Sequence, residues 1–366
     1  MNVNFKYLLL VSFLLSSVSW AKDFYVAPNG NDKNPGALSS PFASILAAQS
    51  AASSGDTVYL RGGTYSLNNE NITSTDSVRA YVNTIAKNGI SYIAYPEEQP
   101  IFDYNNVKPA DLRVVAFFVS GDNNVFEGFE VVGVQVTIDY KRTQSTAFRV
   151  DGGDYNRFEH LSIHDGMAIG WFLQSGSYNQ VINVDVYNNK GFNHYSHGNV
   201  DGFGIHAKSA TGVGNIIKGC RAWFNSDDGF DFINSNAAAT VENSWAMYNG
   251  YDTDFTRMAD GHGFKAGGYG RNGKVDYPVP VPRHVVKNCL AVGNKASGFY
   301  ANHHTGGIDW IHNTAIKNPH NYNMLSTDVE TNAQDIPGFD HYMRNNLGYG
   351  ATSTEVANLG SSKTND

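Results

Sequence analysis

Charged side chains are scarce in this sequence. Asp, Glu, Lys and Arg make up only 16% of the 366 residues, which argues against charged amphipathic helices as the main element. The net charge of −8 at pH 7 argues against nucleic acid as a partner. An anionic polysaccharide stays compatible with this charge, because a bound metal ion can reverse the local sign. After the N-terminus, no apolar run is long enough to span a membrane.

Glycine and aromatic residues are abundant by contrast, with 37 Gly, 21 Tyr and 21 Phe, and Asn recurs along the whole chain. Aromatic residues favour strands, while Gly and Asn favour tight turns. This composition predicts short stacked strands joined by turns.

The N-terminus has the pattern of a secretory signal peptide. Lys6 precedes an apolar run over residues 7–18, and small residues at Ser19 and Ala21 fit cleavage after Ala21. A membrane anchor is the alternative, but the run is shorter than the roughly 20 residues that a spanning helix needs. We therefore expect a signal peptide over 1–21 and a single secreted domain over 22–366, extracellular or periplasmic in transit, with no membrane attachment after cleavage.

Internal repeats dominate the rest of the chain. Six segments share strand-like alternation followed by Asn at a turn, at intervals of 24 to 45 residues. They begin at Phe158, Ile182, Ile217, Val241, Val286 and Ile311. Two Asn columns follow from aligning them: Asn183, Asn243, Asn288 and Asn313 in the first, and Asn189, Asn225, Asn249 and Asn294 in the second.

A Gly-centred tetrad follows most repeats, and four of its five copies read Gly-Phe. The copies begin at Asp165, Asp201, Asp228, His262 and Ser297. Short strands at this period without intervening helices indicate a solenoid, in which the Phe rings stack inside and the Asn amides bond from turn to turn. A β-propeller would need four strands per repeat and a more regular period. We predict an all-β, right-handed parallel β-helix.

The two cysteines test this register. Cys220 and Cys289 fall in one column with Ser244 on the rung between them, which places their Cα atoms roughly 9 to 10 Å apart. A disulfide needs less than about 7 Å, so we expect two free, buried thiols. At the N-terminus, Ser39-Ser40-Pro41 and the apolar face over 45–52 predict a short capping helix, followed by a first strand over 55–60.

Superimposing the tetrads brings acidic residues together. Asp201 and Asp228 share a column, Asp231 and Lys265 share the next one outward, and Asp227 lies at the adjacent turn. The four carboxylates are expected within roughly 5 to 8 Å. Such stacking is destabilising without a bridging cation, and a set of oxygen ligands without His or Cys suits Ca²⁺. Solvated turn aspartates are the alternative.

Lys265 is the candidate catalytic base. A lysine acts as a base only when its pKa is lowered, and a bound cation would offset the opposite effect of Asp231. A salt bridge between Lys265 and Asp231 is the alternative, and it is compatible with the metal-free state. In a uronic acid, removal of the C5 proton beside the carboxylate leads to β-elimination of the 4-linked sugar.

The motifs Asp201-Gly-Phe, Asp227-Asp-Gly-Phe-Asp231 and Gly263-Phe-Lys265 resemble those of the pectate lyases of polysaccharide lyase family nine. The resemblance runs from Asp23 to about Gly350. It implies that the four aspartates bind calcium and that Lys265 accepts the proton. It also implies a (1,4)-linked galacturonan (pectate, from pectin) as substrate, although some members of the family cleave rhamnogalacturonan.

Loops over 250–261 and 269–283 are expected to wall the cleft of a protein that acts as a monomer. Six residues are candidate substrate contacts: Arg257, Arg271, Lys274, Tyr300, His303 and His304. Two other functions stay open. A polygalacturonase-like hydrolase would use paired aspartates but leaves Lys265 without a role. A non-catalytic carbohydrate-binding solenoid would explain the fold but not the convergence of four Asp and one Lys.

Overall fold

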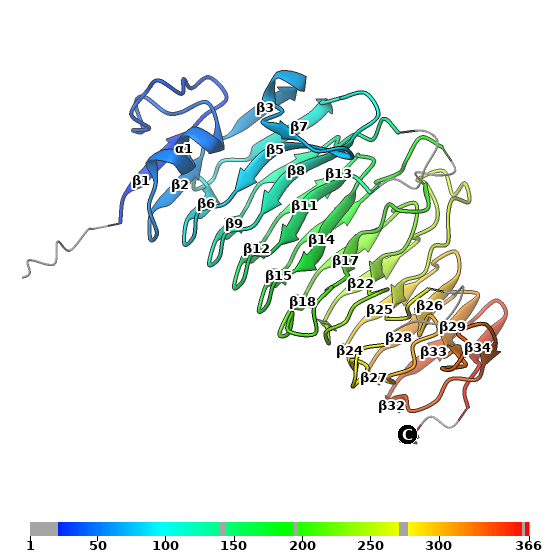
Figure 1. Cartoon of the computed structure of the whole chain (residues 1–366). Helices are drawn as coiled ribbons and strands as arrows, with labels where there is room; N and C mark the ends of the chain where they lie inside the picture. The colour runs from blue at the N-terminus through cyan, green and yellow to red at the C-terminus, as the bar shows by residue number, and fades with distance from the viewer. Residues whose placement is uncertain (1–20, 139–143, 194–196, 271–276, 361–362, 366) are drawn as a thin grey trace, which may run out of the picture.

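The computed structural model describes residues 21–138, 144–193, 197–270, 277–360 and 363–365. Within them, the chain winds into a long stack of coils with three parallel faces (Figure 1). The predicted signal peptide, except for Ala21, lies outside the described residues. No described helix is both long and apolar enough to cross a membrane.

Each coil adds one strand to each of three sheets, which we number 1 to 3. Sheet 1 contains, in spatial order, β1 (Asp23–Val26), β2 (Thr57–Leu60), β6 (Ser91–Ala94), β9 (Val125–Glu127), β12 (Arg157–Glu159), β15 (Gln180–Ile182), β18 (Ile216–Lys218), β21 (Thr240–Glu242), β24 (His284–Lys287), β27 (Ile308–Ile311), β32 (Tyr342–Arg344) and β35 (Lys363–Asn365). Sheet 2 contains β3 (Gly63–Asn68), β7 (Pro100–Asn106), β10 (Glu130–Val132), β13 (Ser162–His164), β16 (Asp185–Tyr187), β19 (Arg221–Trp223), β22 (Trp245–Met247), β25 (Leu290–Val292), β28 (Thr314–Ile316) and β33 (Leu347–Tyr349).

Sheet 3 carries the candidate site. It contains β4 (Ser74–Thr75), β5 (Arg79–Ile85), β8 (Arg113–Val119), β11 (Thr146–Asp151), β14 (Ile169–Ser175), β17 (Phe203–Ile205), β20 (Phe230–Asp231), β23 (Phe264–Lys265), β26 (Ser297–Tyr300), β29 (His320–Asn323) and β34 (Thr354–Ala357). Pairing is parallel throughout except between β4 and β5. A separate antiparallel pair consists of β30 (Ser326–Thr327) and β31 (Asp335–Ile336), and one 3-10 turn covers Asn69–Asn71.

A short helix lies at the N-terminal end of the stack, as predicted, but it starts later than the predicted Ser39-Ser40-Pro41 (Figure 1). Helix α1 (Ile45–Ala51) begins after Ser44, whose Oγ accepts a hydrogen bond from the Ala47 N–H at 3.1 Å. Ile45 and Ala48 are buried in the core. The prediction of the first strand was wrong, because β1 precedes the helix and pairs with β2 in sheet 1.

Two internal ladders confirm the predicted stacking. The rings of Phe203, Phe230, Phe264 and Phe299 stack at centroid distances of 4.9, 4.6 and 5.0 Å. The buried side-chain amides of Asn189, Asn225 and Asn249 each donate to the Asn of the next rung, ending at Asn294, over 3.1 to 3.2 Å. Apolar stacking and a fully hydrogen-bonded polar row therefore hold successive coils in one register.

The predicted alignment was wrong at two places. Trp171 pairs with Phe203, so the first Gly-centred copy is Ile169-Gly170-Trp171 and not the tetrad that begins at Asp165. Asp165 instead occupies a turn, with a φ of 54°. Lys287 pairs with Ile311, so Asn313 lies one residue beyond the column of Asn288. Asn313 Oδ1 instead accepts the Cys289 N–H at 3.0 Å.

The cysteine prediction is confirmed: Cys220 and Cys289 are free and buried. Ser244 lies between them in the column, where its Oγ accepts from the Cys220 N–H at 3.1 Å. Burial raises the pKa of both thiols to about 12, so neither is a reactive thiolate at neutral pH.

We therefore expect a thiol reagent such as Ellman's reagent to leave the folded protein unmodified and to titrate two thiols per chain in denaturant. The burial of both sulfur atoms is the reason. An intact mass without reductant provides the control, since a disulfide would lower it by the mass of two hydrogen atoms. Rapid modification of the folded protein would contradict the described packing.

Candidate active site

The candidate site lies where three neighbouring strands of sheet 3 begin and end. Phe203 pairs with Phe230, and Asp231 pairs with Lys265 on the next rung. Asp201 and Asp228 precede their strands by two residues, so they also lie side by side, and the Asp228 N–H donates to Asp201 Oδ1 at 3.1 Å. The strand register thus fixes which side chains meet.

Three of the four predicted aspartates form one cluster. Asp201, Asp228 and Asp231 each place a carboxylate oxygen within 4.8 Å of the other two, and all three residues are buried. Asp227 is buried nearby and lines the same cleft, but its Oδ1 accepts the Asp260 N–H at 3.0 Å. Asp227 therefore stands beside the cluster and not within it.

Burial and mutual repulsion make this cluster costly. Burial, followed by the charges of Asp227, Asp231 and Asp228, raises the pKa of Asp201 well above its usual value. Burial, followed by the charge of Asp228, also raises the pKa of Asp227 well above its usual value. A cation that lies among these buried carboxylates would stabilise their charged forms.

Lys265 is one such cation. Its Nζ lies 2.9 Å from Asp228 Oδ2 and 3.2 Å from Asp231 Oδ2. Burial alone would lower the pKa of Lys265, but the surrounding carboxylates, Asp228 first, raise it well above its usual value. The ion pair expected as the alternative is thus present, and it is shared with Asp228. In this state Lys265 is an ammonium and not a base.

The cluster also fits a divalent cation. Three rigidly held carboxylates without His or Cys offer hard oxygen ligands, which suit Ca²⁺ better than Zn²⁺ or copper. The raised pKa of Asp201 is a second observation in favour of a cation, because a bound cation would offset both the burial and the neighbouring negative charges that raise it.

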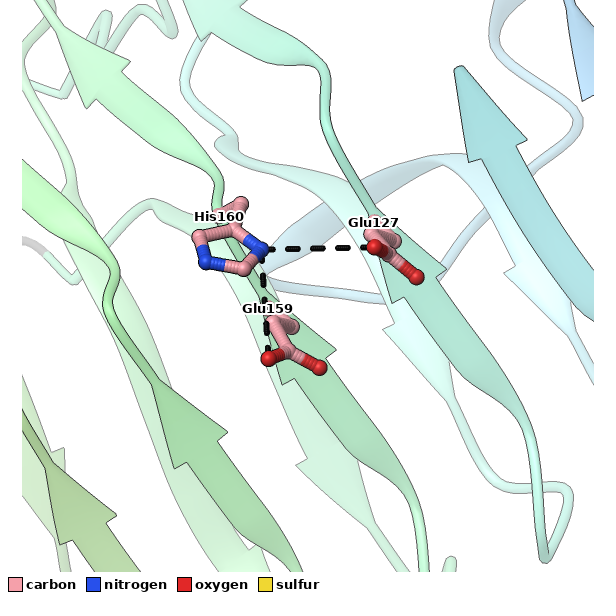
Figure 2. Close-up of side chains that lie close together, drawn as sticks. All are labelled: Glu127, Glu159 and His160. Carbon is pink, nitrogen blue, oxygen red and sulfur yellow. Dashed lines mark ion pairs between the residues drawn. The ribbon is translucent and has the colours of Figure 1, made fainter. Parts of the chain in front are cut away.

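A second group of residues that could bind a metal lies on sheet 1, where β9 and β12 end. Figure 2 shows Glu127, Glu159 and His160, whose Nδ1 lies 4.0 and 3.8 Å from the two carboxylates. These side chains already have partners, because Glu159 pairs with Arg157 and His160 Nε2 contacts the Asn183 amide. The group is therefore explained as part of a surface turn.

A cleft of about 790 Å³ is lined by Lys265, Asp201, Asp227 and Asp231, whereas Asp228 is fully buried. The predicted loops contribute Asp260 and Gly270 to the cleft, and Tyr300 and His303 line it as expected. Among the described lining residues, Lys265 is the one Lys or Arg. Arg271 and Lys274 lie outside the described residues.

Two predicted substrate contacts were wrong. Arg257 is exposed on its loop and is not part of the cleft lining. His304 is completely buried, because its two ring nitrogens connect the Gly268 N–H and the Pro282 carbonyl oxygen at 3.2 and 2.7 Å.

Sequence reasoning also missed two lining residues, His206 and His262. Burial lowers the pKa of both histidines, so both are neutral near pH 7. His262 opens one of the Gly-Phe tetrads in the position that Asp201 and Asp228 hold in theirs. This shared position could have predicted that His262 lies beside the aspartates at the cleft.

Comparison with known proteins supports the geometry. The model of a protein family described as "Pel9A-like, right handed beta helix region" matches residues 24–346 of this chain. Pectate lyase L of Dickeya chrysanthemi is 35% identical over 355 residues, which cover 94% of this chain and 75% of the relative. Pectate lyase PEL9 of Emericella nidulans is 31% identical, over 81% of this chain and 74% of its own.

Two solved structures extend the comparison. A rhamnogalacturonan lyase aligns with a TM-score of 0.90 and 41% identity, over 94% of this chain and 87% of that one. Pectate lyase Pel9A aligns with a TM-score of 0.71 and 31% identity, over 95% and 80%. Together the fold and these relatives define a polysaccharide lyase, and not a hydrolase or a non-catalytic solenoid. The chain belongs to the Pel9A-like right-handed β-helix family.

Proposed function

We propose that this enzyme cleaves a galacturonate-containing polysaccharide by β-elimination, with Lys265 as the base that removes the C5 proton. The observation that carries the proposal is the contact of Lys265 Nζ with Asp228 and Asp231 at the cleft. A buried amine beside a candidate cation site can change its protonation state when the local charge changes.

Asp201, Asp228 and Asp231 would hold a Ca²⁺ ion, with Asp227 beside them. When bound, the ion supplies positive charge that offsets the carboxylates around Lys265 and withdraws electrons from a substrate carboxylate. The strand register keeps Lys265 and the carboxylates on neighbouring rungs, so the amine stays beside the proposed ion site.

In the reaction, Lys265 Nζ takes the proton from C5 of the uronate. The electron pair of the C5–H bond forms the C4–C5 double bond, and the C4–O bond breaks. The leaving sugar oxygen takes up a proton, which completes the balance. One product chain ends in a new reducing sugar, and the other carries the unsaturated uronate at its non-reducing end.

Two polymers share the chemistry that this step needs. Homogalacturonan (pectate) carries a carboxylate on every sugar, and the curated relatives named above are pectate lyases. Rhamnogalacturonan has a neutral sugar between successive uronates, and it is favoured by the 41% identity to a rhamnogalacturonan lyase.

We expect ultraviolet absorbance from the unsaturated uronate to rise when the enzyme meets its polymer, and to stop rising when EDTA is added. Polygalacturonate and rhamnogalacturonan should be assayed side by side, with reducing ends measured in parallel. EDTA followed by excess Ca²⁺ is the control, and it should restore the rate. New reducing ends without ultraviolet absorbance would contradict elimination.

We also propose that the protein is exported before it acts, since its polymeric substrate lies outside the cell. The signal-like sequence over residues 1–21 supports this. The mature domain would act as a monomer on an anionic polysaccharide, with neither nucleic acid nor membrane as a partner.

A further inference from the structure

His262 occupies a defined place beside the catalytic lysine. It lies on the rung after Asp228 and three residues before Lys265, and its ring lines the cleft. The His262 N–H donates to Asp228 Oδ1 at 2.7 Å, and the imidazole stacks on the Tyr300 ring at a centroid distance of 4.3 Å with an interplanar angle of 22°. Main chain and ring are therefore both held in place.

The hydrogen bonding of His262 defines its tautomer. The backbone N–H of Ser297 contacts Nδ1 at 3.2 Å. A backbone N–H can only donate, so Nδ1 must accept with its lone pair. A neutral imidazole that accepts at Nδ1 carries its proton at Nε2, so His262 presents a single N–H donor on the opposite side of the ring.

The same arrangement recurs inside the protein and supports this assignment. His284, His304 and His341 each accept a backbone N–H at Nδ1, over 3.1, 3.2 and 3.1 Å. His304 then has a carbonyl oxygen, that of Pro282, 2.7 Å from Nε2, which requires the proton at Nε2. At His262, no acceptor among the described residues contacts Nε2, and the ring borders the cleft instead.

We propose that His262 is a substrate-binding residue, which donates a hydrogen bond from Nε2–H to an oxygen of the uronate polymer next to Lys265. This inference rests on the lyase function proposed above and adds a contact to it. The carboxylate, hydroxyl and glycosidic oxygens of the polymer can all accept this hydrogen bond. The negative charges of Asp227 and Asp228 nearby would otherwise repel an anionic polymer. A fixed neutral donor at this point holds the sugar without adding a positive charge that would bind the aspartates.

Two substitutions separate the acceptor at Nδ1 from the donor at Nε2. In His262→Asn, the Asn Oδ1 can accept the Ser297 N–H as His Nδ1 does, but the donor to the cleft is lost. One column of turn residues before sheet 1 uses both side chains as the acceptor: Asn215 Oδ1 accepts the Asn179 N–H at 3.0 Å, and two rungs further on His284 Nδ1 accepts the Ala239 N–H at 3.1 Å. His284→Asn is thus a matched control, buried away from the cleft.

We expect His262→Asn to lower kcat/KM by about 10- to 100-fold, the usual effect of losing a hydrogen bond to a charged group. His284→Asn should keep the rate of the unchanged enzyme. His262→Gln, whose amide nitrogen reaches the position of Nε2, should recover part of the loss. The ratio between His262→Asn and the unchanged enzyme should stay constant above neutral pH, because the donor does not change its charge there.

A His262→Asn rate within about twofold of the unchanged enzyme would overturn the inference, since a lost hydrogen bond costs more than that. A ratio that changes with pH would also overturn it, because the residue would then be exchanging a proton. If His262→Asn does not fold, the rate of His262→Gln decides: a rate below a hundredth of normal contradicts a donor role. Absence of elimination by the unchanged enzyme on both polymers would contradict the proposed function instead.

Discussion

Replacing Lys265 by Arg is expected to lower kcat for elimination by about 10²- to 10⁴-fold, the usual contribution of a general base. Arginine keeps the positive charge that Asp228 and Asp231 require, so the buried carboxylates stay paired. Its guanidinium is not deprotonated in proteins, so it cannot accept the C5 proton. The rate of formation of unsaturated uronate measures the effect, and the melting temperature should change little.

Lys218→Arg is the matched control. Lys218 lies on sheet 1, a different face of the stack from the strands of sheet 3 that carry the site, and it pairs with Glu242 at 3.2 Å. Its variant should retain the full rate. A Lys265→Arg protein with more than a tenth of the normal kcat would rule out Lys265 as the base, whatever the polymer.

The second large effect concerns the aspartate cluster and calcium. Because Ca²⁺ would bind only the folded protein, it should stabilise the fold by about 2.7 kcal/mol at a free concentration of about 100 times Kd. In Asp201→Asn this stabilisation should disappear, and elimination should be lost with it. In EDTA the variant should instead be more stable than the unchanged protein, since it removes one of three clustered buried carboxylates.

The difference in stability between Asp201→Asn and the unchanged protein should depend on pH in one direction. The raised pKa of Asp201 means that the folded protein keeps a proton that the unfolded chain releases above about pH 4. In EDTA, the free energy of unfolding of the unchanged protein therefore falls relative to Asp201→Asn as pH rises from 4. The stabilisation by Ca²⁺ should grow over the same range, because the ion replaces that proton.

Urea unfolding at several pH values, with Ca²⁺ or with EDTA, measures both effects. Asp185→Asn is the matched control: Asp185 lies on sheet 2 and pairs with Arg221 near the surface, so its response to Ca²⁺ should equal that of the unchanged protein. Equal stabilisation of Asp201→Asn and the unchanged protein by Ca²⁺ would mean that the ion binds elsewhere.

Repetition made most of the fold and the core of the site predictable. In a parallel stack, residues that share a column are neighbours, so aligning the Gly-Phe copies was enough to pair Asp231 with Lys265. The alignment failed where a copy departs from the pattern. Gly166-Met167 resembled Gly-Phe, but the strand of that rung begins only at Ile169, since Asp165 turns the chain first.

Loop and ring contacts were not predictable in the same way. Whether a loop residue such as Arg257 faces the cleft depends on how its insertion folds back, which no column records. His303 and His304 are adjacent in sequence, but one lines the cleft and the other is buried between Gly268 and Pro282. Asp227 shows the same limit, because its carboxylate is drawn aside by the Asp260 N–H of such a loop.

The separation between rungs and loops has a consequence for how this enzyme family diversifies. The groups proposed for proton removal stand on successive rungs, whose order is fixed by the Phe and Asn ladders. The cleft walls come from segments that leave the stack between rungs, and these can lengthen or shorten without moving the rungs. Evolution can therefore keep one reaction while changing the polymer, as expected when the proteins most like this chain are named for pectate in some cases and for rhamnogalacturonan in another.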